Sequence, residues 1–175
     1  MYYALTLALM AFSLVAHEMG HWCLLKRFEV PIKEVWVGMG PRLASLGFLR
    51  IGMLPLGASI NPEPKPFEAL SAERRMWVAL GGPIASVLWG VMLLIGSTYA
   101  DGRPAEGLAW LGVLNCGIAV FNMIPMPPLD GFAAVAAYGE SLGRPLPEWA
   151  KRLAYRVGNG VIYGAGFLCL GHALF

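Results

Sequence analysis

The stretch "SLVAHEMGHWCLLKRF", residues 13–28, places two histidines and a glutamate in a segment that is otherwise apolar. The apolar run around it covers residues 2–25, close to the roughly 20 residues that a helix needs to cross a hydrocarbon core about 30 Å thick. Ionisable side chains at that depth cost roughly 2.5–3.5 kcal/mol each, so they usually serve a function. We therefore expect His17, Glu18 and His21 to carry the chemistry of this protein.

The composition of the whole chain is that of a membrane protein. Its residues are 57% hydrophobic and only 14% charged, against about 25% charged in soluble domains. Three further apolar stretches, at 76–99, 108–124 and 157–175, approach the length of a membrane span. We predict an α-helical polytopic protein of the cell membrane with about four transmembrane helices. The alternative for the first stretch, a signal peptide, lacks the basic segment that precedes an apolar signal run.

The basic residues are distributed unevenly among the connections between these stretches. Of the 13 Lys and Arg residues, eight lie within 26–75 and four within 139–156, whereas 101–107 contains only Arg103. Cytoplasmic loops carry the excess of positive charge, which predicts both termini outside the cell and the active site toward the cytoplasm. We interpret the basic residues as a topology signal, and expect a lipid bilayer and no nucleic acid as the partner of this surface.

The segment that follows the first stretch, residues 30–66, has a different character. It is rich in Gly and Pro and contains short β-prone runs at 34–37 and 48–54. This pattern predicts extended strands and tight turns. We expect a small membrane-associated β-hairpin in which residues 48–57 form a strand followed by a turn containing Pro55. Such a strand could hold an unwound substrate by β-augmentation.

The third apolar stretch ends in "FNMIPMPPLDGF", residues 121–132. Three prolines and an Asp-Gly pair are incompatible with a regular helix, because proline removes a backbone donor and clashes with the preceding turn. We therefore expect the span to break before it leaves the membrane. A short helix is predicted at 132–138, before the fourth stretch.

The residues His17-Glu18-Met19-Gly20-His21 form an HExxH pattern on the first helix. Positions i and i+4 share a helix face, so both imidazoles can reach one Zn²⁺, and the adjacent glutamate can act on a zinc-bound water. The alternative is a structural pair of buried histidines, which the cost of such residues in lipid disfavours.

A catalytic zinc site needs a third protein ligand and an open fourth position. Asp130 is the single acid in the proline-broken segment, at the depth of the two histidines; a turn residue of the Asp-Gly pair is its alternative role. The other candidates, near the span ends or on the outer connection, are His172, Glu140, Asp101 and Glu106.

Two of these motifs together resemble the site-2 protease family of intramembrane zinc metalloproteases: HEMGH at 17–21 and Asn122-x-x-Pro125-x-x-x-Leu129-Asp130-Gly131. Over residues 1–135 three further stretches are similar to that family. They are its glycine-rich stretch at 37–41, its membrane-associated β-hairpin at 52–57 and its GPxxN motif at 82–86. Ser86 stands where that motif usually has Asn.

The resemblance implies a cofactor, an activity and roles for particular residues. His17, His21 and Asp130 would bind Zn²⁺. Glu18 would act as general base and acid, and Asn122 would contact the substrate. The implied reaction is hydrolysis of a peptide bond within or near the transmembrane segment of single-span membrane proteins.

The domain organisation follows from the same patterns. We expect one membrane-embedded metalloprotease domain over 1–175, with a core at 1–135 and a C-terminal helix at 157–175. No connection is long enough for the PDZ or CBS domains of some relatives. The competing hypothesis is a membrane metal-binding protein or metal transporter without hydrolytic activity. Glu18 favours the hydrolase, because a transporter has no need for an acid between its metal ligands.

Overall fold

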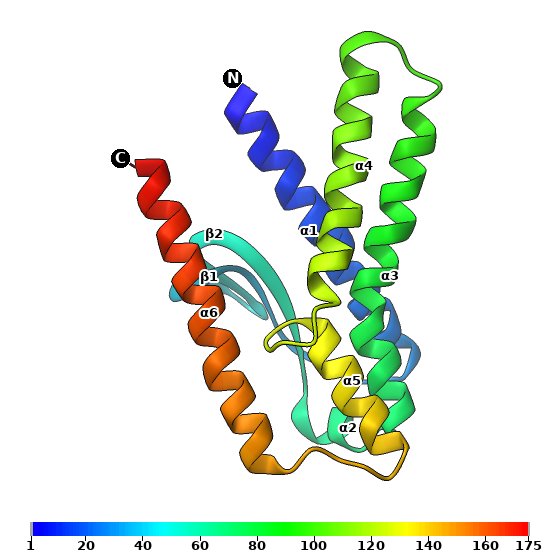
Figure 1. The fold of residues 1–175 in the computed structure, drawn as a ribbon, viewed down its shortest axis with the longest axis vertical. Helices are drawn as coiled ribbons and strands as arrows, with labels where there is room; N and C mark the ends of the chain where they lie inside the picture. Colours follow the sequence, from blue (N-terminus) through cyan, green and yellow to red (C-terminus); the bar gives the residue numbers. More distant parts are fainter. Residues whose placement is uncertain (1, 175) are drawn as a thin grey trace.

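The structure is a computed structural model that describes the backbone of residues 2–174. Side chains are described for residues 12–38, 40–53, 57–162 and 164. Long helices surround a small sheet (Figure 1). In chain order the elements are α1 (Tyr2–Arg27), β1 (Ile32–Leu46), β2 (Leu49–Pro62), α2 (Pro64–Glu68), α3 (Ala72–Ser97), α4 (Gly102–Asn122), α5 (Asp130–Ser141) and α6 (Glu148–Leu174).

Within the described residues, α3 and α4 are the two helices long and apolar enough to cross a membrane. They form a hairpin whose connection lies at one extreme of the molecule (Figure 1). The side-chain hydroxyl of Ser71 accepts a hydrogen bond from the backbone N–H of Arg74 at the start of α3. The other two predicted spans lie within α1 and α6, which are 26 and 27 residues long. Four membrane-crossing helices remain a prediction.

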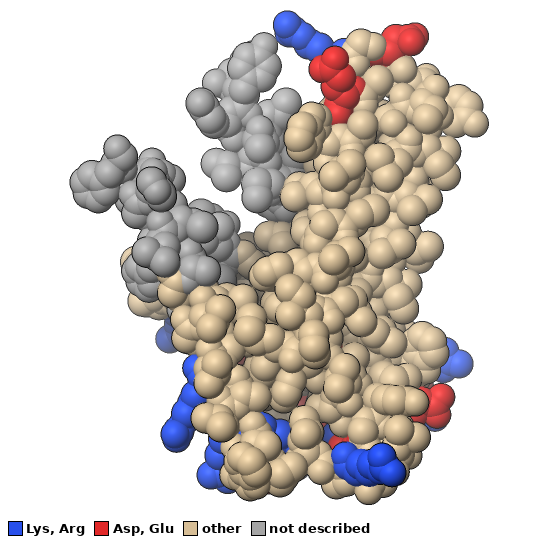
Figure 2. All heavy atoms as spheres, in the orientation of Figure 1, with Lys and Arg blue, Asp and Glu red and all other residues tan. Residues whose placement is uncertain are grey.

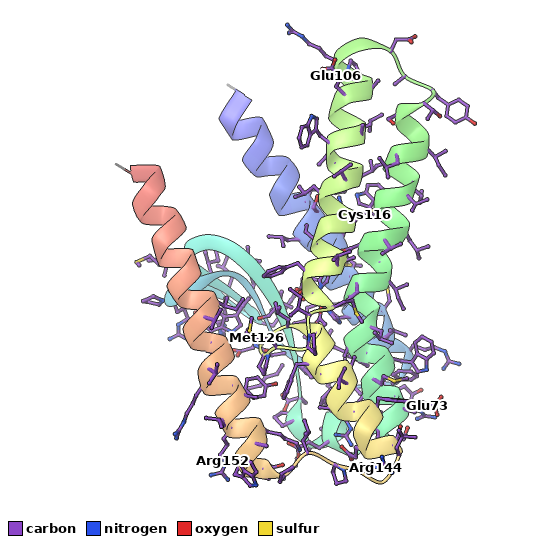
Figure 3. The ribbon with its side chains drawn as sticks, in the orientation of Figure 1. Glu73, Glu106, Cys116, Met126, Arg144 and Arg152 are labelled. Atoms are coloured by element: carbon purple, nitrogen blue, oxygen red, sulfur yellow. The ribbon has the colours of Figure 1, made fainter. Side chains whose placement is uncertain are left out.

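The charged side chains lie toward the two ends of the molecule. Figure 2 shows Lys, Arg, Asp and Glu at the ends of the visible face, with a band of uncharged surface between them. Glu106 lies beside the α3–α4 connection, whereas Glu73, Arg144 and Arg152 lie toward the opposite end (Figure 3). An uncharged band between two charged ends is the pattern of a protein surrounded by lipid.

The β-hairpin is longer than its sequence indicated, and its turn lies elsewhere. β1 and β2 pair antiparallel, with the turn at residues 47–48, where Gly47 adopts a φ of 58°. Pro55 therefore lies inside β2 and not in a turn, so the prediction of a turn after residue 54 is wrong. Glycine adopts positive φ without steric cost. Gly38, Gly40 and Gly57 also have positive φ within the strands, so this freedom permits the turn at Gly47 but does not select it.

The pairing of the two strands is irregular, with several register shifts. Trp36 of β1 is opposite both Ser59 and Arg50 of β2, and its neighbours repeat this double pairing. The two ends of β2 therefore flank the first part of β1. As a result, the last residues of β2, 57–62, lie beside α1 and not at the hairpin tip.

The break after the third apolar stretch is present. α4 ends at Asn122, residues 123–129 are not helical, and α5 begins at Asp130; Met126 marks this connection in Figure 3. α5 starts two residues earlier than the predicted 132–138 and ends later. Gly131 lies so close to the carbonyl groups of Met123 and Ile124 that a Cβ atom would overlap them. Asp130 is thus the first residue of a helix, not part of a turn.

α3 and α4 cross at two glycines, Gly90 and Gly112, whose backbones are in close contact. A Cβ atom on Gly112 would lie 2.8 Å from the carbonyl oxygen of Gly90, closer than packing allows. We expect Gly112→Ala to lower the free energy of unfolding by about 1–3 kcal/mol, because the helices must separate. Thermal unfolding in detergent measures the effect.

The matched control for this substitution is Gly107→Ala in the same helix, where nothing lies within 4 Å of the added Cβ. It should be neutral, or stabilising by up to about 1 kcal/mol, since Ala favours helix over Gly. Equal melting temperatures for the two variants would show that the glycine contact does not hold α3 and α4 together.

Candidate metal centre

α1 and α3 cross at a point where both carry glycine. A Cβ atom on Gly81 would lie 2.7 Å from the carbonyl oxygen of Gly20, so a side chain at either position would separate the helices. Small residues allow such close backbone approach between helices in membranes. The crossing lies between His17 and His21 on α1 and places both imidazoles directly against α3.

Three side chains converge beside this crossing. Nε2 of His17 and Nε2 of His21 lie 2.9 Å and 3.3 Å from the same oxygen of Asp130, Oδ2, and 3.4 Å from each other. The three side chains are only 5%, 12% and 22% exposed. α1 supplies the two nitrogens and the first residue of α5 supplies the oxygen.

The spacing of these atoms suits a zinc ion. Tetrahedral Zn²⁺ with bonds of about 2.0–2.1 Å separates its ligand atoms by roughly 3.3 Å. The observed separations of 2.9, 3.3 and 3.4 Å surround this value. Two imidazoles and one carboxylate are also a donor set that leaves a fourth position open, as catalytic zinc sites do. Among the described residues these three form the one group of His, Cys, Asp and Glu able to share a metal ion.

The second nitrogen of each imidazole has its own partner on α3. Nδ1 of His17 lies 2.9 Å from the hydroxyl oxygen of Ser86, and Nδ1 of His21 lies 2.7 Å from the carbonyl oxygen of Val78. Metal-binding histidines usually donate their other N–H in this way, which fixes the orientation of the ring. Both rings therefore present Nε2 to Asp130.

Gly82 provides the space for this arrangement. A Cβ atom at that position would overlap Nε2 of both His17 and His21. Gly82 lies midway between Val78 and Ser86 on the same face of α3. Along this face, the carbonyl of Val78, the space above Gly82 and the hydroxyl of Ser86 therefore follow one another at intervals of about one helical turn.

Glu18 lies next to the cluster but is not one of its three donors. It lines the same cavity as the histidines and as Ile60 of β2. This position leaves the carboxylate beside the metal centre and available to a bound molecule. A base adjacent to a metal ion, but not bound to it, can take up and return a proton.

A cavity of about 1120 Å³ connects the cluster with the charged end of the molecule. Its inner part is lined by Glu18, Asn122 and the end of β2, and its outer part by Arg75, Glu140 and Lys151. The amide nitrogen of Asn122 donates to the carbonyl oxygen of Ile118 at 3.0 Å.

At the outer part of this cavity, charged side chains are paired. Nη2 of Arg75 lies 2.5 Å from Oε1 of Glu140, and Nζ of Lys151 lies 2.8 Å from Oε1 of Glu148. The hydrogen bond from Lys151 lowers the pKa of Glu148, which lies outside the lining of this cavity. Charged side chains thus line the outer part of the cavity.

The candidate residues identified from the sequence fall into distinct places. His17, His21 and Asp130 are brought together, and Glu18 and Asn122 line the cavity beside them. Glu140 pairs with Arg75. Asp101 and Glu106 lie at and just after the α3–α4 connection. The side chain of His172 lies outside the described residues.

Sequence reasoning missed the contributions of α3. Val78 acts through its backbone and has no sequence signal. Gly82 and Ser86 belong to the stretch that resembles a known motif, but nothing in their spacing indicated that they would contact the histidines.

We expect Gly82→Ala to weaken the binding of Zn²⁺ by about 10–100-fold or more, the range for lost support of metal ligands. The added methyl group would occupy the position of the two Nε2 atoms. A competition titration against a chromogenic chelator measures the affinity. Gly96→Ala in the same helix, where nothing lies within 4 Å, is the control. Wild-type affinity in Gly82→Ala would contradict this geometry.

Two curated proteins are similar to this chain. A zinc metalloprotease of Methanocaldococcus jannaschii is 29% identical over 136 residues, which cover 74% of this chain and 33% of that protein. A Clostridium acetobutylicum protein whose name proposes a zinc metalloprotease is 26% identical over 122 residues, covering 61% of this chain and 36% of that protein. The chain spans about a third of the length of these two relatives.

A solved structure and a family model agree with these relatives. The site-2 protease from Methanocaldococcus jannaschii has a similar fold, with a TM-score of 0.62 and 26% sequence identity, covering 95% of this chain and 69% of that chain. The model of peptidase family M50 matches residues 5–102 and 97–164, which include both histidines and Asp130. The motifs, the convergence of the three donor atoms and these similarities agree: the chain belongs to peptidase family M50.

Proposed function

We propose that this protein is an intramembrane zinc metalloprotease that hydrolyses a peptide bond within or near the transmembrane segment of single-span membrane proteins. The observation that carries the proposal is the convergence of two imidazole nitrogens and one carboxylate oxygen beside a separate carboxylate, that of Glu18. The curated name and the solved structure's name from Methanocaldococcus jannaschii, a zinc metalloprotease and a site-2 protease, support both the metal and the reaction.

The proposed setting is the lipid bilayer, with α1 and α6 crossing it in addition to α3 and α4. The polar connection between α3 and α4 and both chain termini would lie outside, and the more basic end in the cytoplasm. His17 precedes Lys26 by nine residues, which places it roughly 14 Å inside the cytoplasmic end of α1. The cavity that reaches the paired charges of Arg75 and Glu140 offers a route for water to that depth.

His17, His21 and Asp130 would hold the zinc ion, which supplies a Lewis acid for the scissile carbonyl and lowers the pKa of bound water to about 7. The carboxylate of Glu18 would accept a proton from the attacking water. It would return a proton to the nitrogen of the breaking C–N bond, so that a carboxylate and an amine are released.

The last residues of β2 are proposed to bind the substrate. A helical substrate must unwind before its carbonyl reaches the metal, and each unpaired backbone group in lipid costs several kcal/mol. Residues 57–62 line the cavity beside Glu18, so an extended segment can pair with this strand. The sequence had indicated residues 48–57 for this role, but the register of the hairpin brings the end of β2 to the cavity. Asn122, on the cavity wall, would contact the same segment.

The first test concerns the metal. We expect about one Zn²⁺ per purified chain, lost when His17, His21 or Asp130 is replaced by Ala, because each contributes one donor atom. Elemental analysis of the variants measures zinc content. Full zinc in Asp130→Ala, together with its loss in His172→Ala, would identify a different third ligand.

The second test separates metal binding from chemistry. Glu18→Gln should keep its zinc, because Glu18 is not a ligand, but cleave a single-span substrate about 10²–10⁴-fold more slowly, the usual contribution of proton transfer. Zinc content and cleavage rate are measured on the same preparation in lipid vesicles. Near-normal cleavage would rule out this role of Glu18 and favour a metal-binding protein without hydrolytic function.

A further inference from the structure

The face of α3 that contacts the histidines repeats the spacing of the histidines themselves. Val78, Gly82 and Ser86 are four residues apart, as are His17 and His21 on α1. The two helices run in opposite directions (Figure 1), so the order of contacts is reversed. Val78 therefore meets His21, and Ser86 meets His17.

The two acceptors on α3 differ in chemical kind. The partner of His21 is a backbone carbonyl, which can only accept a hydrogen bond. The partner of His17 is a hydroxyl group, which can either accept or donate. The tautomer of His21 is thereby restricted to the one with its proton on Nδ1 and a free electron pair on Nε2. The tautomer of His17 is not restricted in this way.

The surroundings of His17 make Ser86 the available partner for its Nδ1. Ser86 is 0% exposed and His17 is 4% exposed, so bulk water does not reach this contact. A neutral imidazole carries one N–H, and Nε2 must be free of a proton to bind a metal ion. The proton of His17 must then lie on Nδ1, which points at the hydroxyl oxygen 2.9 Å away.

We propose that Ser86 is a positioning residue for the metal centre: its hydroxyl oxygen accepts the hydrogen bond from Nδ1–H of His17 and holds Nε2 toward the metal. The inference rests on the proposed zinc site and adds a supporting residue to it. Nε2, the other ring nitrogen of His17, lies 2.9 Å from Oδ2 of Asp130. The two ring nitrogens of His17 thus each face one partner, Ser86 and Asp130.

Removal of this hydroxyl leaves Nδ1 of His17 without its partner. In Ser86→Ala the N–H of metal-bound His17 would be buried without an acceptor, and a buried donor left unpaired is costly. Zinc affinity should fall by about 10–100-fold, the usual effect of losing the partner of a metal-binding histidine. Ser86→Thr and Ser86→Asn keep an acceptor oxygen, and at least one of them should restore the affinity.

The experiment measures the zinc dissociation constant of each variant by chelator competition, and the ¹⁵N shifts of the imidazole nitrogens of His17 in the zinc-bound protein. The control is Ser97→Ala, in the same helix, whose hydroxyl donates to the carbonyl of Leu94 and not to the metal centre. Thermal unfolding of the metal-free proteins separates a general loss of stability from a specific loss of zinc binding.

The expected result is a loss of zinc affinity in Ser86→Ala larger than its loss of metal-free stability explains, rescue by Thr or Asn, and a wild-type spectrum with the proton on Nδ1. Wild-type affinity in Ser86→Ala, or no rescue by either variant, would overturn the inference while leaving the zinc site intact. Failure of the wild-type chain to bind zinc would instead overturn the proposed function, and this inference with it.

Discussion

The contact between α1 and α3 is the constraint on which the rest of the site depends. At Gly20 and Gly81 the two backbones approach so closely that no side chain fits between them. This approach brings the carbonyl of Val78 and the hydroxyl of Ser86 within hydrogen-bond distance of the imidazoles. A wider crossing would leave both ring nitrogens without partners in a region that excludes water, and the rings would lose their fixed orientation.

The break between α4 and α5 supplies the third donor of the site, Asp130, which the α1–α3 crossing does not provide. A continuous helix would carry the chain past the histidines, because all its backbone groups would be paired internally. The prolines prevent this, and the chain begins a new helix at Asp130 with the carboxylate facing both Nε2 atoms. Gly131 allows the start of α5 to pack directly against the end of α4, because a side chain there would overlap the carbonyls of Met123 and Ile124. Irregular backbone at this depth is tolerated where it lines a cavity, as residues 128–130 do here.

The hairpin shows where sequence patterns lose their predictive value. Its β-prone runs and glycines indicated strands and turns, and strands are present. The location of the turn at Gly47, the extension of β2 through Pro55 and the double pairing of Trp36 were not predictable. Register is decided by contacts between residues far apart in sequence. Four glycines of the hairpin, at 38, 40, 47 and 57, have positive φ, so this conformation does not mark the turn. The consequence is functional, because register decides that residues 57–62 lie beside Glu18.

The sequence by itself determined the features that depend on local spacing. Two histidines four residues apart must share a helix face, and the three clustered prolines at 125–128 end α4, although the isolated Pro83 lies within α3. Only the tertiary structure decided what meets those histidines: Asp130 is 113 positions from His17 and Ser86 is 69 positions away. Helical periodicity carries no information over such separations. The side chain opposite His17 is set by how closely α1 and α3 pack, which is a property of two surfaces and not of either sequence alone.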